Sequence, residues 1–332
     1  MKVHFRKHRG NWSRPLLCVT HTERPMDLKQ CSREYFITQF GAASRLPPKV
    51  PFEALTHARE FSPWKGSVTV WGLCDDGRQL PELLAYFEPT AYKPQQVLWY
   101  RERLWLLGLE QLEVFDSELR LIRRLEDPWL SVEHTVFPDE RGRLVASCSA
   151  SDAILFIDPH TYTVMDFARV PESIYGHNYH LKREDSVVEH YLHNDLQLAH
   201  LNCAWPWRGG VLITTLIQGA IGWFDSDKHY HELLRGYVGC HGIRTNQEGN
   251  LYFCDSCAGT VVVLSPELKV LQEYPTGSKW LHDAQQITRE LYALAVSDRN
   301  VLAFVEPHTS RPVFGLDGRN FGEGVQSVSY GR

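Results

Sequence analysis

The feature that most constrains this chain is a β-strand repeat whose copies each begin at a histidine. In the best-formed copy, residues 240–266, an apolar segment at His241 precedes a polar turn, a strand at Leu251–Cys254, a second turn and a β-branched strand at Thr260–Leu264. Short apolar runs bounded by Gly, Asn, Asp and Ser are typical of antiparallel hairpins. Similar copies begin at three other histidines: His134, His200 and His282.

The spacing of these copies predicts their architecture. The starts at residues 200, 241 and 282 lie 41 residues apart. A period of about 40 residues built from short strands indicates the blades of a β-propeller. The interval from 134 to 200 is longer, at 66 residues, and its excess falls in about 175–198. We interpret that segment as a lid-like insertion between two blades.

The two ends of the chain complete the blade count. A further copy begins at Gln96, and residues 33–87 predict a group of strands without an inner strand. Residues 324–329 predict an inner strand without partners, and joining the two groups removes both exposed edges. We therefore predict an all-β, six-bladed β-propeller, closed by a C-terminal inner strand that pairs with N-terminal strands. It forms one domain over 28–332, after an N-terminal extension at 1–27.

Composition narrows the partners that this chain is expected to bind. The net charge of −5 argues against nucleic acid, because phosphate binding needs a dense basic surface. We expect no membrane partner, since no apolar run approaches the length of a transmembrane helix, and no signal peptide is evident. These features favour a cytoplasmic location. The eight cysteines, including the Cys254/Cys257 pair, are therefore interpreted as reduced thiols.

One repeat carries a family resemblance. The sequence GNLYFCDSCAGTVVVLSP at 249–266, preceded by HGI at 241–243, resembles a blade of the NHL-repeat and gluconolactonase-like six-bladed propellers. The resemblance implies the fold and not the chemistry, because propellers carry many functions. Gluconolactonases bind metal mainly through carboxylate and amide side chains, and their ligand motifs are not found in this chain.

A second resemblance concerns the repeated histidines. An axial histidine site is similar in kind to that of peptidyl-hydroxyglycine amidating lyases, six-bladed propellers whose histidines hold zinc. It is also similar in kind to that of carotenoid cleavage oxygenases, in which four histidines surround iron on a seven-bladed axis. The resemblance implies four candidate metal ligands in this chain: His134, His200, His241 and His282.

The repeat itself supports such a site. The first strand of each blade lines the central channel, so residues at one register form a ring around the axis. Imidazole suits zinc, iron, copper and nickel. We predict one divalent transition metal and favour iron(II), because four histidines without a carboxylate suit a redox ion with open positions; zinc or copper are alternatives. A purely structural role, in which each histidine caps channel water or backbone, stays open.

Other residues near this register are candidates for catalysis. Gln96 and Gln326 occupy it in the two remaining blades and would face substrate. Glu133 and Asp283 adjoin two of the histidines and would orient a neighbouring blade's imidazole. The insertion adds four more histidines that would lie at the channel mouth: His177, His180, His190 and His193.

These residues predict a metal-dependent enzyme that acts on a small molecule or peptide at the channel mouth. An iron(II) oxygenase or other oxidoreductase is the first hypothesis. A zinc-dependent lyase or hydrolase is the second. A non-catalytic propeller that binds a protein or peptide is the third, and it differs from the others in needing no metal. The sequence does not define the oligomeric state.

Overall fold

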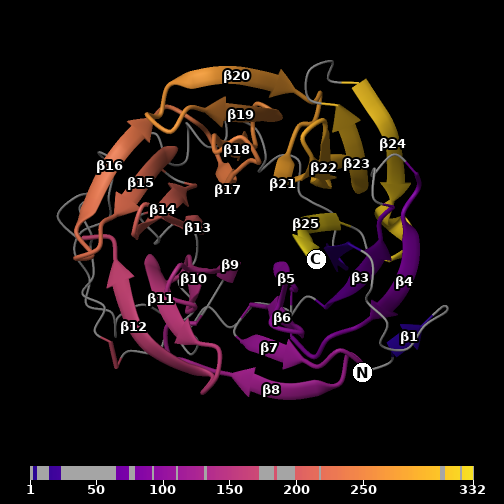
Figure 1. Ribbon diagram of the computed structural model, residues 1–332, viewed down its shortest axis with the longest axis horizontal. Coiled ribbons are helices and arrows are strands. Elements are labelled where there is room, and N and C mark those ends of the chain that lie inside the picture. Colours follow the sequence, from indigo (N-terminus) through magenta and orange to yellow (C-terminus); the bar gives the residue numbers. More distant parts are fainter. Residues whose placement is uncertain are drawn as a thin grey trace.

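A computed structural model of the chain provides the atomic description. It describes residues 3–5, 15–23, 65–74, 79–91, 93–109, 111–130, 133–171, 183–184, 199–216, 218–306, 311–321 and 324–331. Six antiparallel sheets are arranged around a central axis in a closed ring (Figure 1). The predicted six-bladed β-propeller is therefore confirmed. Among the described residues, no helix has the length and hydropathy needed to span a membrane.

The first blade, blade 1, combines both ends of the chain. It holds β1 (Val3–Phe5), β2 (Leu16–Thr22), β3 (Gly66–Gly72), β4 (Glu82–Phe87) and β25 (Gly324–Gly331). Its order is β1-β4-β3-β2-β25, so β25 is the innermost strand and pairs with β2 along its length. This confirms the predicted closure by the C-terminal strand.

The other five blades each contain four consecutive strands, and the first strand of each is the innermost. Blade 2 holds β5 (Gln96–Tyr100), β6 (Arg103–Leu107), β7 (Leu112–Phe115) and β8 (Leu121–Leu125); blade 3 holds β9 (Glu133–Pro138), β10 (Leu144–Cys148), β11 (Ala153–Asp158) and β12 (Thr163–Arg169). Blade 4 holds β13 (Leu201–Trp207), β14 (Gly210–Thr215), β15 (Ala220–Phe224) and β16 (Tyr230–Arg235). Blade 5 holds β17 (Cys240–Thr245), β18 (Leu251–Asp255), β19 (Thr260–Leu264) and β20 (Val270–Pro275). Blade 6 holds β21 (Leu281–Thr288), β22 (Leu291–Val296), β23 (Val301–Glu306) and β24 (Arg311–Asp317), with 3₁₀ turns η4 (Ser297–Arg299) and η5 (Gly318–Asn320).

The N-terminal segment differs from the sequence prediction. Residues 1–27 were expected to form an extension, yet they contain β2, whose seven residues are all buried. The sequence LLCVTHT is rich in apolar and β-branched residues, and burial on both faces of a sheet favours such a run. The predicted strand at 33–40 and most of the insertion at 175–198 lie outside the described residues.

Packing between blades holds the ring together. One apolar cluster joins Ile154 and Phe156 of blade 3 to Ile213 and Phe224 of blade 4. Burial of such side chains stabilises a fold by about 25 cal/mol per Å² of apolar surface. The innermost strands are almost completely buried, whereas β8 and β20 on the rim are mostly exposed. The inner strand ends are therefore held in a rigid frame around the channel.

Candidate metal centre

Three histidines share one structural position on the inner strands. In blades 3, 5 and 6 the first inner-strand residue pairs with the last residue of the second strand, as Glu133 does with Cys148, Cys240 with Asp255 and Leu281 with Val296. The next residue is a histidine in each blade. It lies in or beside a β-bulge, where two residues face one on the partner strand. Bulges re-aim a side chain, and they are common next to functional sites. These histidines are His134, His241 and His282.

Blade 4 departs from the predicted register. Leu201 takes the first position, so the bulged residue is Asn202 and not His200. His200 precedes β13 and has a left-handed φ of 50°, which is strained for a residue with a Cβ. In blade 1 the bulged residue is Gln326, as the predicted ring required. The sequence prediction placed His200 at the same position as His134, His241 and His282. Among the five bulged strands, the predicted residue differs from the observed one only in blade 4.

The histidine rings converge on the channel axis. Ring centroids lie 4.5 Å apart for His241 and His282, and 5.2 Å apart for His134 and His200. The three histidines at the shared register each offer a ring nitrogen, and these nitrogens lie within 4.8 Å of one another. His200 is outside this three-nitrogen group. The group therefore brings together one ligand atom from each of three blades.

Burial keeps these imidazoles neutral. Removal from water lowers the pKa of His200 to about 3 and that of His282 to about 4. The same cause, aided by neighbouring histidines, lowers the pKa of His134 and of His241 well below 6.5. A histidine must be neutral to bind a metal ion. At neutral pH these histidines are therefore unprotonated, which is the form that binds a metal ion.

Hydrogen bonds orient two of the rings. His241 Nδ1 lies 2.7 Å from the Gly239 carbonyl oxygen and 2.8 Å from Ser256 Oγ. A ring nitrogen that donates to a carbonyl leaves the other nitrogen, Nε2, as the metal-binding atom. His282 is hydrogen-bonded to the backbone of Gln326, which also fixes its ring. This hydrogen bond raises the pKa of His282, whereas burial lowers it. His134 Nε2 is buried with no hydrogen-bond partner among the described residues.

Asp283 does not orient a histidine. Both of its oxygens bind the Arg244 guanidinium, at 2.6 Å and 3.0 Å, and they also accept from the backbone N–H groups of Ala284 and Val328. Arg244 is fully buried and donates further to the Ala284 carbonyl. Gly242, at φ +62°, packs on this pair, and a Cβ there would lie 2.5 Å from Asp283 Oδ1. Through these contacts Asp283 ties blades 5, 6 and 1 together, in place of the predicted contact with a neighbouring imidazole.

The remaining predicted residues take different places. Gln96 is buried, and its Oε1 accepts from the Val136 backbone N–H at 2.5 Å, while its Nε2 has no partner among the described residues. Gln326 is buried on β25 beside His282. Glu133 begins β9, and its side chain lies outside the described part, as do His177, His180, His190 and His193. Cys254 and Cys257 form no disulfide in the described part of the chain.

Lys93 and Gln95 were missed by the sequence analysis. Both lie in the loop that leads into β5, where no strand periodicity marks them. Lys93 is half-buried, and burial lowers its pKa to about 8. Gln95 is fully buried, and neither of its amide atoms has a partner among the described residues. The run Lys-Pro-Gln-Gln directly before an inner strand is the only signal that could have drawn attention to them.

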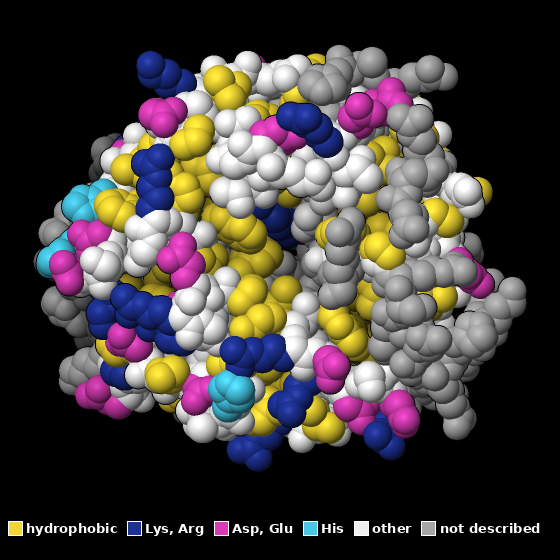
Figure 2. Space-filling model, viewed as in Figure 1, with side chains coloured by type: hydrophobic (Ala, Val, Ile, Leu, Met, Phe, Trp, Pro, Cys, Tyr) yellow, Lys and Arg dark blue, Asp and Glu magenta, His cyan; other side chains and the backbone are white. Residues whose placement is uncertain are grey.

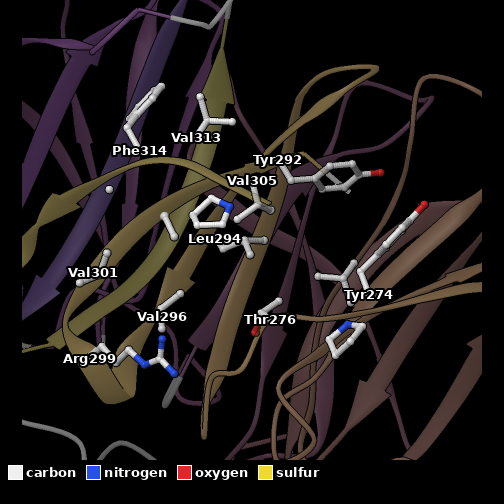
Figure 3. Close-up of a pocket in the computed structure, with 15 residues that line it drawn as sticks. Tyr274, Thr276, Tyr292, Leu294, Val296, Arg299, Val301, Val305, Val313 and Phe314 are labelled. Carbon is white, nitrogen blue, oxygen red and sulfur yellow. The ribbon is translucent and has the colours of Figure 1, made fainter. Parts of the chain in front are cut away.

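One pocket lies away from the axis. It has a volume of about 500 Å³ and sits between blades 5 and 6. Figure 3 shows Leu294, Val296 and Val305 on its wall, with Arg299 at one end. The space arises because small side chains such as Ala303 and Gly315 line it. None of the candidate metal ligands lines this pocket.

On the face seen in Figure 2, the centre of the ring is hollowed, with hydrophobic side chains around the opening and Lys or Arg atoms inside it.

Comparison with known proteins supports the fold. No protein-family model and no curated protein sequence matches the chain. Virginiamycin B lyase from Staphylococcus aureus superposes with a TM-score of 0.51 at 10% identity, over 76% of this chain and 80% of that one. The likeness is one of fold.

Two further solved structures agree. A protein of unknown function from Bacteroides caccae has a TM-score of 0.58 at 8% identity, over 80% of this chain and 95% of that one. A catalytically inactive histidine-to-alanine variant of the Staphylococcus aureus lyase with quinupristin has a TM-score of 0.50 at 9% identity, over 78% and 85% of the two chains.

Proposed function

We propose that this protein is a metal-dependent enzyme whose ion is held on the propeller axis by His134, His241 and His282. The observation that supports this most strongly is the convergence of three buried, neutral imidazoles, one from each of three blades, with nitrogens within 4.8 Å. Buried polar groups without partners cost stability. A bound ion would offset that cost by accepting their lone pairs.

The ligand set fits a zinc-type Lewis acid. Bonds of about 2.0–2.1 Å to a tetrahedral ion place nitrogens roughly 3–4 Å apart, which small rotations of these side chains would achieve. Three neutral imidazoles leave the ion its full charge and one open position. An ion held in this way polarises a substrate carbonyl or activates a bound water. A zinc-dependent lyase or hydrolase acting on a small molecule or peptide is therefore our first proposal.

Structural neighbours share the fold on which this proposal rests. Virginiamycin B lyase is one of them, and a histidine-to-alanine variant of that lyase is catalytically inactive. In this chain, the buried inner strands would exclude water from the ion.

His200 favours a second candidate. Its ring lies 5.2 Å from that of His134, so a rotation would bring it to the same ion as a fourth ligand. Four imidazoles and two open positions suit iron(II) and oxygen chemistry, the function first favoured from the sequence. The number of histidines bound to the ion therefore separates the two candidates.

Metal analysis of untagged protein tests the proposal. We expect about one equivalent of zinc or iron per chain, and loss of that metal in a His241→Ala/His282→Ala double variant. His231→Ala is the matched control, because His231 is exposed on β16 and pairs with Asp225. Electron paramagnetic resonance of the nitrosyl adduct would identify iron(II). Folded wild-type protein that takes up no transition metal would contradict the enzyme proposal and favour a non-catalytic binding propeller.

A further inference from the structure

The pocket between blades 5 and 6 exists because two of the smallest residues meet at its centre. Ala303 of β23 pairs with Leu294 of β22 on one side and with Gly315 of β24 on the other, so the three form one row across the sheet. In blade 5 the row at the same register, counted from the inner strand, begins with Phe253 and Val262, which are fully buried against blade 4. Blade 6 has no such bulk in this row, and the space stays open.

This pocket has two apolar walls and the size of a small-molecule site. Its volume of about 500 Å³ lies within the roughly 300–1,000 Å³ that is usual for ligand pockets. Blade 6 supplies one wall, which includes Leu294, Val296 and Val305, and blade 5 supplies Val261 and Tyr274 opposite them (Figure 3). A molecule that fills the pocket therefore needs an apolar body.

The hydroxyl groups in the lining are already engaged by the protein. Those of Tyr274, Tyr292 and Thr276 are each hydrogen-bonded to a group of blade 5. Their rings and carbon atoms, rather than their hydroxyls, are what they offer to a ligand. Polar recognition must come from another lining residue.

Arg299 carries the only charge among the described residues that line the pocket. It lies in η4 at one end of the pocket (Figure 3), and its side chain is 58% exposed. Its guanidinium donates to the Gly277 carbonyl, while its Nε lies 3.8 Å from Asp298 Oδ2, beyond hydrogen-bond distance. The Asp298 carboxylate accepts instead from Ser278 Oγ at 2.6 Å and from the Lys279 backbone N–H at 3.0 Å. A guanidinium has five N–H donors, so Arg299 has donors for an anionic ligand.

We propose that this pocket is a second binding site, which takes a molecule with an apolar body and one carboxylate, such as an aliphatic or aromatic monocarboxylic acid. The apolar body fills the space beside Ala303 and Gly315, and the carboxylate accepts charge-assisted hydrogen bonds from Arg299. The inference goes beyond the proposed metal chemistry and does not depend on it, because none of the four axial histidines lines the pocket.

Calorimetric titration of decanoate into the full-length protein tests the charge preference. Decanol and decyltrimethylammonium are the comparison probes, since they have the same chain length and a different charge. We expect one equivalent of decanoate to bind and the cation not to bind. Arg299→Gln should weaken decanoate binding at least tenfold and leave decanol binding unchanged. Arg120→Gln is the control, because Arg120 is an exposed arginine of blade 2 that pairs with Asp116.

Filling the pocket tests its location. Ala303→Leu places a larger side chain at the centre, and we expect it to abolish decanoate binding while the melting temperature stays the same or rises, since cavity filling commonly stabilises a fold. Gly315→Val takes its place if Ala303→Leu does not fold, because a Cβ at Gly315 points to Val301 Cγ1, 3.2 Å away.

Three results would overturn the inference. The first is that wild-type protein binds no decanoate, or binds it no more tightly than decanol and the cation. The second is that decanoate binding persists in the filled variant. The third is that wild-type protein self-associates with rising concentration and Ala303→Leu does not, since a second copy of the chain would then occupy the pocket.

Discussion

Two polar groups are buried on the axis of this propeller, and they differ in how they are satisfied. Arg244 and Asp283 pair with each other and with the backbone of blades 6 and 1, and only Arg244 Nε has no partner among the described residues. In the histidine cluster, His134 Nε2 has no partner in the described part of the chain, and neither do the amide nitrogens of Gln95 and Gln96. Both groups are equally removed from water.

Buried polar groups that pair with each other, such as Arg244 and Asp283, stabilise the fold. Buried polar groups without partners, such as those of the histidine cluster, form a candidate ligand-binding site. Removing one partner of a closed network leaves a buried charge. The histidines and the neighbouring amides form an open cluster, in which some buried polar atoms have no partner. Removing such a group removes the free-energy cost of burying it. The two groups should therefore respond in opposite ways to substitution, and the following experiments test this.

The largest effect is expected at Asp283. Asp283→Ala leaves Arg244 charged and unpaired in the interior, so the free energy of unfolding should fall by about 3–5 kcal/mol. Urea denaturation followed by tryptophan fluorescence measures this. Asp227→Ala, on an exposed turn, should change stability by less than about 0.5 kcal/mol. If Asp283→Ala changes the free energy of unfolding by less than about 1 kcal/mol, the Arg244–Asp283 pair contributes no more to stability than the histidine cluster.

The pH dependence of stability should come from the histidine ring. Because the folded-state pKa of His282, about 4, lies below its ordinary 6.5, the unfolded chain binds the proton more strongly. Stability from this group is therefore complete above about pH 6.5 and is lost as pH falls toward 4, by about 3 kcal/mol in total. Denaturation midpoints at pH 7.5, 6, 5 and 4.5 measure the loss, and His282→Ala should reduce it. A flat profile over this range would contradict the burial of neutral rings.

An intermediate effect is expected at Ser256. Its hydroxyl lies 2.8 Å from His241 Nδ1, so Ser256→Ala removes one of the two contacts that hold this ring. Loss of such an outer contact weakens metal affinity by about 10–100-fold. Competition with a chromophoric chelator measures the affinity. Ser265→Ala, in the turn between β19 and β20, is the control. Unchanged affinity in Ser256→Ala would show that the Gly239 carbonyl suffices to orient the ring.

The smallest effect has the opposite sign. Both amide atoms of Gln95 lack partners among the described residues, so Gln95→Met should raise stability by about 1 kcal/mol. Thermal melting measures this change. If Gln95→Met lowers stability, the Gln95 amide stabilises the fold, as the Arg244–Asp283 network does.

The fold was predictable because each blade repeats a strong local pattern. Strands such as Thr260–Leu264 are β-branched runs between turn residues, and the 41-residue spacing fixes their grouping. The strand at Leu16–Thr22 was missed because it is isolated from the repeats and follows a basic, irregular segment. Its assignment depends on pairing with β25, which lies some three hundred residues away in the chain.

The site was predictable only in part. Three of the four histidines occupy the shared register, since the blades repeat there. In blade 4 that position is held by Asn202, and His200 lies two residues before it. Asp283 looked like a free carboxylate because its partner, Arg244, lies on another blade. Lys93 and Gln95 were missed because the loop before β5 has no strand periodicity.

The position of β25 has a consequence for how the protein is made. This strand lines the channel, its Gln326 backbone contacts His282, and its Val328 completes the Asp283 network. During synthesis from the N-terminus, residues 16–306 can leave the ribosome before any of these contacts exists. Closing the ring joins the most distant parts of the chain, a step that is intrinsically slow. The growing polypeptide therefore cannot present the three histidines in the finished geometry, and the proposed metal site would be complete only after the last strand has inserted.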